Sequence, residues 1–453
     1  MLKKAVGISF AFIGVVVGAG FASGQEAMQY FVAFGTQGIW GAVLGSVLML
    51  VGGVSILQLG SYYQAKEHME VLGSISGKVL SWVLDIATII TLFSIGFVMF
   101  AGAGSNLNQQ FGLPIWVGAV VMLGLVIFFG LMDVDKVTAA IGTITPFLIT
   151  FVVVSCVWTL ATSDVSWAVL NEQASNVDTT LPNWWISALN YTGLNFICVS
   201  SMAIVIGGNY LDTRSAGVGG LLGGLGYLVM LMLLTFGLMS QASTVAGEDM
   251  PLLALINSLH PWFGLAMSLV LFGMIFATAL GMFYALGKRL ARGHENRYRL
   301  IFISTCLVGF VLSFVGFQRL VAYVYPALGY MGLVLIVTVF ASWMRALQKL
   351  SAEGNRRRRA LELMRIKLDP RRRFMKKDQE ELAKLSKASN VPDDEFAESV
   401  EEEVGEELAE DDEVDYDPEE GGSDVMYVSY AEPVSHTEQK PGADGDQPDP
   451  TRM

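Results

Sequence analysis

Charged residues are scarce in this sequence. They make up 16% of its 453 residues, whereas hydrophobic residues make up 53%, and a typical soluble domain has about 25% charged residues. The mean hydropathy is +0.50. This composition excludes an ordinary soluble protein and predicts a chain that crosses a lipid bilayer several times.

Residues that build metal centres, disulfides and catalytic sites are also few. The sequence has four histidines, without metal-ligand spacing, and three cysteines, all within apolar segments. An odd number of cysteines in such segments indicates small buried residues instead of a disulfide framework. The sequence has no nucleotide-binding loop and no nucleophile–base set, so we expect neither an ATP-driven motor nor an enzyme. We also expect no metal, no organic cofactor and no nucleic-acid partner.

Charge is distributed unevenly along the chain. Residues 1–349 contain 14 Lys and Arg against 13 Asp and Glu, whereas residues 350–453 contain 15 against 29. We therefore predict a nearly neutral transmembrane domain over 1–345, a basic cytoplasmic juxtamembrane helix over 346–388 and an acidic, disordered cytoplasmic tail over 389–453. The bases of the middle segment could bind anionic lipid.

Ten apolar segments are candidates to cross the bilayer, which takes about 20 residues of helix. They cover about 5–33, 38–60, 79–104, 114–132, 136–162, 184–208, 216–240, 262–287, 300–316 and 320–344. With the N-terminus inside, the inner loops and the ends carry 13 Lys and Arg, and the outer loops carry Arg319 alone. Because Lys and Arg accumulate on the cytoplasmic side, we predict a cell-membrane protein with both termini in the cytoplasm.

The first apolar segment carries residues that a simple anchor does not need. Four glycines lie between residues 14 and 24, and Glu26 places a carboxylate at membrane depth. Glycine costs about 1 kcal/mol relative to alanine inside a helix, and the carboxylate costs about 2.5 kcal/mol or more. These residues predict a broken helix whose free amides and carbonyls line a binding cavity. A signal peptide and close helix packing are the alternatives, but packing does not explain Glu26.

Polar residues also interrupt the sixth segment. Asn190, Thr192, Gly193 and Asn195 lie near its middle and predict a second broken helix or, alternatively, polar contacts between helices. Segments 1 and 6 are the first members of two sets of five. Because five is odd, the second set enters the membrane from the opposite side, and corresponding breaks in two inverted halves are typical of secondary transporters.

Two strings carry a resemblance to known families. The string GAGFASGQE at residues 18–26, together with NYTG at 190–193, is similar to the YkvI-like bacterial membrane proteins. Its Gly-x-Gly start resembles the unwound segment of the amino acid–polyamine–organocation superfamily. The resemblance covers about residues 3–345. It implies the LeuT fold, an all-α polytopic membrane protein with about ten transmembrane helices in a 5+5 inverted repeat and with broken helices 1 and 6.

The resemblance also implies a central site for a small solute, commonly an amino acid or a related amine. The residues that would bind this substrate are Gly18, Ala19, Gly20, Ser23, Glu26, Tyr191, Thr192 and Asn195. Sodium-coupled relatives hold a cation between helices 1 and 8, which corresponds here to carbonyls near Gly14 and Val17 and to the hydroxyl of Thr278. Helix 8 of those relatives usually has two adjacent hydroxyls, so the single Thr278 weakens the case for Na⁺ and leaves coupling to H⁺ open as the alternative.

Glu26 has several possible roles at membrane depth. It could take up and release a proton, attract an amine substrate or form a structural hydrogen bond with helix 6. Asp85, about two turns into the third segment, could belong to an inner gate or pair with Lys136. We interpret the chain as a secondary active transporter, a permease or symporter that works by alternating access. The alternative is a transporter-like membrane sensor that signals through its cytoplasmic tail.

Overall fold

The computed structural model describes residues 2–75, 77–132, 144–162, 171, 174, 177–291, 294–369 and 371–409. Every regular element in this part of the chain is a helix. The chain divides into two compact units, Met1–Asn355 and Arg356–Met453, and the division falls inside a single long helix. The first unit contains the helices that correspond to the ten predicted segments.

The first predicted segment corresponds to three consecutive helices, and each of the others corresponds to one. In order they are α1 (Leu2–Val16), α2 (Ala19–Ser23), α3 (Gln25–Tyr30), α4 (Thr36–Tyr63), α6 (Lys78–Phe111), α7 (Ile115–Gly130), α9 (Ile144–Thr162), α11 (Trp184–Gly208), α12 (Thr213–Ser240), α15 (Pro261–Leu290), α16 (Tyr298–Ser313) and α17 (Phe317–Leu368). Short helices α5 (His68–Ile75), α13 (Ala242–Val245) and α14 (Pro251–Leu259) lie between them. Within the described ranges, seven helices are long and apolar enough to cross a bilayer, and α7 and α16 are shorter apolar helices. The chain is therefore a polytopic membrane protein.

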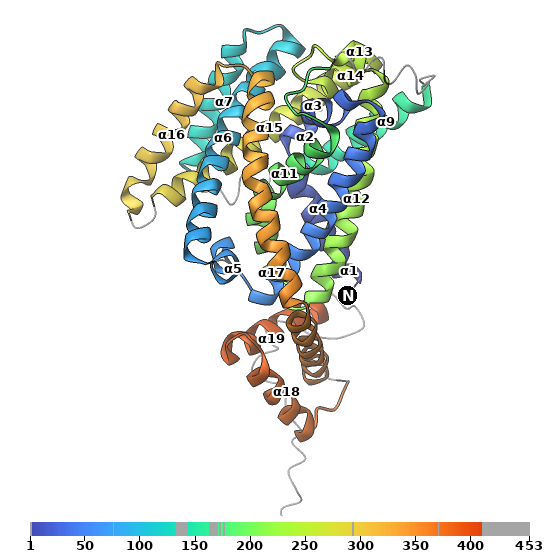
Figure 1. Cartoon of the computed structure of the whole chain (residues 1–453). Coiled ribbons are helices and arrows are strands. Elements are labelled where there is room, and N and C mark those ends of the chain that lie inside the picture. Colours follow the sequence, from blue (N-terminus) through green and yellow to red (C-terminus); the bar gives the residue numbers. More distant parts are fainter. Residues whose placement is uncertain are drawn as a thin grey trace, which may run out of the picture. The chain divides into compact units, whose positions relative to one another are not determined.

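The helices of the first unit pack in two groups (Figure 1). In one group α4 and α12 pack against each other, α4 also packs against α11, and α12 packs against α1. In the other group α6 packs against α7, α15 and α16, and α15 packs against α16 and α7. These contacts repeat with an offset of five segments: α4 contacts α11 as α12 contacts α1, and α6 contacts α7 as α15 contacts α16. This symmetry is what a 5+5 repeat predicts.

The break that we expected in the sixth segment is absent, because α11 continues from Trp184 to Gly208. Its polar side chains bond to carbonyls of the preceding turn and leave the helix intact. The hydroxyl of Thr192 donates to the Ala188 carbonyl at 2.8 Å, and the Asn195 amide donates to the Tyr191 carbonyl at 3.0 Å. The prediction that the sixth segment forms a broken helix is therefore wrong for this structure. The alternative, in which its polar residues make contacts between helices, is correct.

Asn190 and Gly193 join α11 to its neighbours. A Cβ atom on Gly193 would lie 2.2 Å from the Gly329 carbonyl oxygen, so α11 and α17 approach closely only because this residue lacks a side chain. The side-chain amide of Asn190 donates to the Pro326 carbonyl at 2.8 Å, and its oxygen accepts from the Tyr30 hydroxyl at 3.1 Å. One polar residue at membrane depth thus connects α3, α11 and α17.

Pro326 lies inside α17 without ending it. Proline has no N–H group, so the carbonyl one turn earlier, that of Ala322, has no intrahelical donor. The Thr180 hydroxyl donates to this carbonyl at 2.6 Å and the Gln29 side-chain amide donates to it at 3.4 Å. The helix continues because two side chains replace the missing donor, as is usual for prolines at membrane depth.

Asp85 forms an ion pair with Arg289, which links α6 to the C-terminal end of α15. The partner that we had considered, Lys136, lies outside the described residues. The pair is partly accessible, with side-chain exposures of 36% for Asp85 and 14% for Arg289. The pair therefore joins α6 to α15 at a partly accessible position, and the role of Asp85 in an inner gate stays a prediction.

The second unit contains the end of α17 together with α18 (Lys376–Ala388) and α19 (Asp393–Ala409). Helix α19 occupies a stretch where we expected disordered chain. Its apolar side chains recur at every fourth position and are buried: Phe396, Val400, Val404 and Leu408. Packing of such a stripe stabilises a helix whose composition is otherwise strongly acidic. Residues 410–453, the remainder of the predicted tail, lie outside the described residues.

Candidate functional site

The prediction of a broken first helix is confirmed, and the structure has two breaks in it. Between α1 and α2 the chain is extended at Gly18, with φ −92° and ψ −171°. Between α2 and α3 it turns at Gly24, whose φ of 79° is a left-handed conformation that favours glycine. Ser23 stabilises the second turn: its hydroxyl donates to the Gly20 carbonyl at 2.7 Å and accepts from the backbone N–H of Gln25 at 3.1 Å. This hydroxyl, which we expected at the substrate, is therefore occupied within the turn.

Glu26 lies in the first turn of α3 and folds back over α2. Its exposed fraction is 7%. A Cβ atom on Gly20 would lie 1.7 Å from Glu26 Oε1, so the carboxyl occupies the space that a side chain at residue 20 would fill. A Cβ atom on Gly18 would meet no atom within 4 Å. The two glycines therefore differ: one makes room for Glu26, and the other faces open space at the break.

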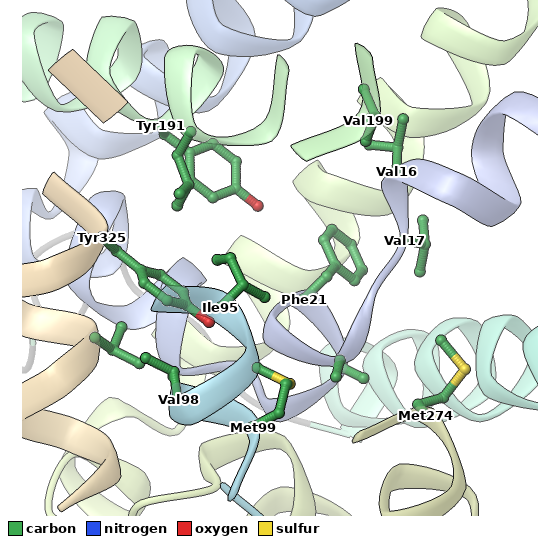
Figure 2. Close-up of a cluster of buried hydrophobic side chains, with 14 of the residues drawn as sticks. Val16, Val17, Phe21, Ile95, Val98, Met99, Tyr191, Val199, Met274 and Tyr325 are labelled. Carbon is green, nitrogen blue, oxygen red and sulfur yellow. The ribbon is translucent and has the colours of Figure 1, made fainter. Parts of the chain in front are cut away.

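Four buried tyrosines, each from a different helix, lie within electrostatic range of Glu26. They are Tyr30 of α3, Tyr191 of α11, Tyr227 of α12 and Tyr325 of α17, each at most 1% exposed, and each interacts electrostatically with the Glu26 carboxyl. The rings of Tyr30 and Tyr191 are 5.0 Å apart. In Figure 2 the hydroxyls of Tyr191 and Tyr325 both point toward the middle of the cluster of buried side chains.

We predicted only one of these tyrosines, Tyr191, from the sequence. The signal for Tyr30 was available, because it follows Glu26 by four residues and so lies on the same helix face. Tyr227 and Tyr325 gave no local signal, since they belong to helices that reach Glu26 only through the tertiary fold.

The hydroxyl of Tyr191 has no hydrogen bond of normal geometry with any described residue, although it is buried. It lies close to Glu26, Tyr227 and Asn195. The Tyr30 hydroxyl, by contrast, is already engaged, because it donates to Asn190. A buried hydroxyl without a partner is uncommon in proteins. The Tyr191 hydroxyl beside the Glu26 carboxyl is therefore a polar pair that a ligand can engage.

Thr192, Asn195 and Ala19 are the remaining substrate candidates. The Thr192 hydroxyl faces α4, where it is 3.3 Å from the Gly45 carbonyl. The Asn195 side-chain amide donates to the Tyr191 backbone carbonyl at 3.0 Å, and the same side chain lies close to the Tyr191 hydroxyl. Ala19 is buried and begins α2, so its amide has no intrahelical carbonyl to which it can donate.

The candidate cation site between the first helix and α15, the helix of the eighth predicted segment, has both polar and apolar side chains. Thr278 donates its hydroxyl to the Met274 carbonyl of its own helix at 2.9 Å. Val17 and Met274 belong to one buried cluster (Figure 2). A Cβ atom on Gly14 would lie 3.9 Å from the methyl group of Thr145, and the Thr145 hydroxyl is 4.0 Å from Met274 Sδ. The structure thus places a second threonine, from α9, next to these residues.

Comparison with known proteins gives the following relatives. The chain is 24% identical to the uncharacterized membrane protein YkvI of Bacillus subtilis (strain 168) over 332 residues, which are 73% of this chain and 93% of YkvI. It is 26% identical to the uncharacterized protein YyaD of the same organism over 326 residues, 72% of this chain and 93% of YyaD. No protein-family model matches the chain.

Among solved structures, the chain is similar to MhsT in complex with L-phenylalanine. The TM-score is 0.54 at 12% identity, covering 87% of this chain and 98% of MhsT. A manganese transporter of Eremococcus coleocola matches with a TM-score of 0.48 at 11% identity, over 90% of this chain and 86% of that one, a likeness too loose to argue from.

The chain has the LeuT-type fold. The predicted likeness to YkvI is confirmed at the level of sequence similarity, and the similarity to MhsT supports the predicted fold. Identities this low show the fold alone, so the membership in the amino acid–polyamine–organocation superfamily and the substrate stay predictions. In the part of the chain that the structure describes, no three His, Cys, Asp or Glu side chains gather as they would around a metal ion.

Proposed function

We propose that this protein is a secondary active transporter of a small solute that works by alternating access in the cell membrane. The observation that carries the proposal is the double break of the first helix beside the buried Glu26. In a bilayer, irregular backbone is tolerated where it lines a cavity, and transporters of this architecture bind their substrates at such breaks. Gly18 and the Glu26–Tyr191 pair form the centre of the proposed site.

Glu26 supports protons as the coupling ion. A carboxylate without a basic partner is costly at membrane depth, and protonation removes that cost. The interactions of Glu26 within the described chain involve tyrosines and a cysteine, with no base among them. The alternative cation site near Gly14, Val17 and Thr278 would favour Na⁺ instead.

Uptake into proteoliposomes tests this function and its coupling ion together. Vesicles that contain the full chain should accumulate or exchange solute when only a pH gradient is imposed, and a Glu26→Gln protein should lose this accumulation. Protein-free vesicles and the surface variant Glu67→Gln are the controls. Accumulation driven by sodium alone would transfer the coupling role to the site near Thr278.

The orientation is part of the same proposal. With both termini in the cytoplasm, single cysteines introduced within 163–183 should react with an impermeant thiol reagent from outside, whereas those within 288–299 should not. The reverse labelling pattern would overturn the orientation. We further propose that bases of 346–388 contact anionic lipid, which binding to vesicles with and without anionic lipid would test.

A membrane sensor is the second candidate function. The observation that favours it is the continuity of α17, which runs without interruption from the first unit into the second. A ligand-induced shift of this helix would reach the cytoplasmic unit directly. A protein that binds ligand and changes the protease sensitivity of residues 356–409, but moves no solute in vesicles, would establish this function over transport.

A further inference from the structure

The structure assigns the site at Glu26 to an organic cation, an amine or alkylammonium ion without a carboxylate, that exchanges with a proton. This inference rests on the proposed transport function and names its substrate class. Its basis is the juxtaposition of one buried acid and four tyrosines at the break of the first helix, and one of these tyrosines, Tyr191, has a buried hydroxyl that forms no hydrogen bond of normal geometry with a described residue.

The charge of the site favours a cation as the ligand. Glu26 is the acid that folds over Gly20, and the groups that interact with it in the described chain are Tyr30, Tyr191, Tyr227, Tyr325 and Cys198. None of these groups is positively charged. A buried carboxylate needs an opposite charge to offset its desolvation, and a bound cation would supply it. A second carboxylate, brought by an amino acid, would be repelled by Glu26 at this point.

The aromatic rings around the acid also favour a cation. Cations bind to the faces of tyrosine rings, and several rings around one acid are typical of sites for alkylammonium ions. Tyr30, Tyr191 and Tyr325 come from three different helices, and each interacts electrostatically with Glu26. The hydroxyls of Tyr191 and Tyr325 point toward the middle of the buried cluster (Figure 2). The Tyr191 hydroxyl, which forms no hydrogen bond of normal geometry with a described residue, offers a lone pair to an ammonium N–H group or a polarised C–H group.

The single acid accounts for the exchange of the cation with a proton. One carboxyl group neutralises either a proton or a substrate cation, but not both. When the cation binds, the O–H bond of Glu26 breaks and the proton leaves to the solvent on the side to which the site is open. When the cation leaves, a proton returns to the carboxylate. If the empty, charged form does not reorient, the protein exchanges one organic cation for one proton, and an inward proton gradient drives export of the cation.

Matched ligand pairs test the substrate class on the purified full-length protein. We expect phenethylamine to raise the melting temperature more than L-phenylalanine does, and choline to raise it more than glycine betaine does, because each pair differs by the presence of a carboxylate. Equal or larger shifts with the two zwitterions would overturn the assignment, and so would a panel of such pairs in which no cation binds.

The dependence of choline binding on pH tests the exchange. Choline cannot lose its charge, so any change of its affinity with pH reports the protein. Its affinity should rise by up to about tenfold per pH unit while the proton on Glu26 competes, and binding should release protons in calorimetry performed in two buffers. An affinity that is independent of pH, without proton release, would overturn the exchange.

Two variants locate the effect. Glu26→Gln should reduce choline affinity at least about tenfold and abolish its pH dependence, whereas Glu67→Gln should change neither. Tyr325→Phe keeps a ring face and should bind within about threefold of the unmodified protein, but Tyr325→Leu should lose about fivefold or more. Equal binding by the Phe and Leu variants would refute the role of the ring.

Transport in vesicles separates failure of this inference from failure of the proposed function. Vesicles that exchange zwitterions for protons, or a Glu26→Gln protein that binds cations normally but cannot accumulate them, would refute the cation site and leave a transporter. A protein that binds cations with the expected pH dependence but moves none would refute transport and leave the site.

Discussion

Gly18 and Gly20 stand two residues apart in the broken helix, and the structure predicts different outcomes when each is replaced by alanine. At Gly18 the new Cβ atom meets nothing within 4 Å, and the backbone, with φ −92° and ψ −171°, is one that alanine adopts. At Gly20 the Cβ atom would lie 1.7 Å from Glu26 Oε1 and 2.6 Å from Glu26 Cδ. The first variant therefore tests the open space, and the second tests the position of the acid.

The expected magnitudes follow from these distances. Gly18→Ala should leave the folded protein unstrained and stabilise it by about 0.4–1 kcal/mol, because alanine has fewer unfolded conformations. Gly20→Ala forces the Glu26 carboxyl to move by about 2 Å to reach ordinary contact. Overpacking typically costs about 1–3 kcal/mol of stability, and the cost here should not exceed this because a carboxyl group is the end of a flexible side chain. Ligand affinity and its pH dependence should both be lost.

Thermal melting and choline binding measured on the same preparations would check both variants. Gly281→Ala is the control, because a Cβ atom there also meets nothing within 4 Å and the residue is exposed on α15. A Gly18→Ala protein with unchanged affinity would show that the ligand does not use this space. A Gly20→Ala protein that keeps both affinity and pH dependence would show that Glu26 is not the binding acid.

Three further predictions concern stability. Gly193→Ala should lower the melting temperature through about 1–3 kcal/mol of overpacking against the Gly329 carbonyl; a melting point equal to that of the Gly281→Ala control would refute the close contact of α11 and α17. The Arg371 side chain hydrogen-bonds Asp369 and holds the pKa of that carboxyl below its usual value, so its stabilising contribution should be complete above about pH 4. This contribution should disappear as the pH falls through the lowered pKa. Asp369→Asn should remove this loss of stability at acid pH in circular dichroism melts; an unmodified protein with the same acid-side melting behaviour as the variant would show that the pairing contributes nothing. Ending the chain after residue 409 should leave its melting temperature unchanged, whereas ending it after residue 388 removes α19 and should cause aggregation; equal behaviour of the two truncations would contradict the packing of α19.

The fold could be predicted because its signals are local. Each membrane helix is encoded by a continuous apolar run, and the first break is encoded by Gly18, Gly24 and the acid that follows them. Their effects on a helix do not depend on which neighbours surround it. The order of the segments then determines which helices correspond in the two halves.

The sixth helix could not be predicted correctly, because its polar residues have meaning only in the tertiary structure. Asn190 breaks nothing, since its amide reaches the Pro326 carbonyl and its oxygen accepts from Tyr30. These partners lie more than 130 residues away in the sequence. Helix α19 was missed for a different reason: the average composition of the tail hid an apolar stripe of only four residues, Phe396 to Leu408.

The hydrogen-bond state of each polar side chain at membrane depth separates structural residues from those available to a ligand. Thr192 and Asn190 have partners that the fold itself supplies, and Ser23 is used in the turn at Gly24. In a medium without water such groups are satisfied internally, and their bonds stabilise helix contacts. Glu26 and the Tyr191 hydroxyl differ, because the acid has no basic partner in the described chain and the hydroxyl has no partner of normal geometry there. Polar groups left in this condition cost stability, so their presence together at the break of the first helix is best explained by a ligand that completes them.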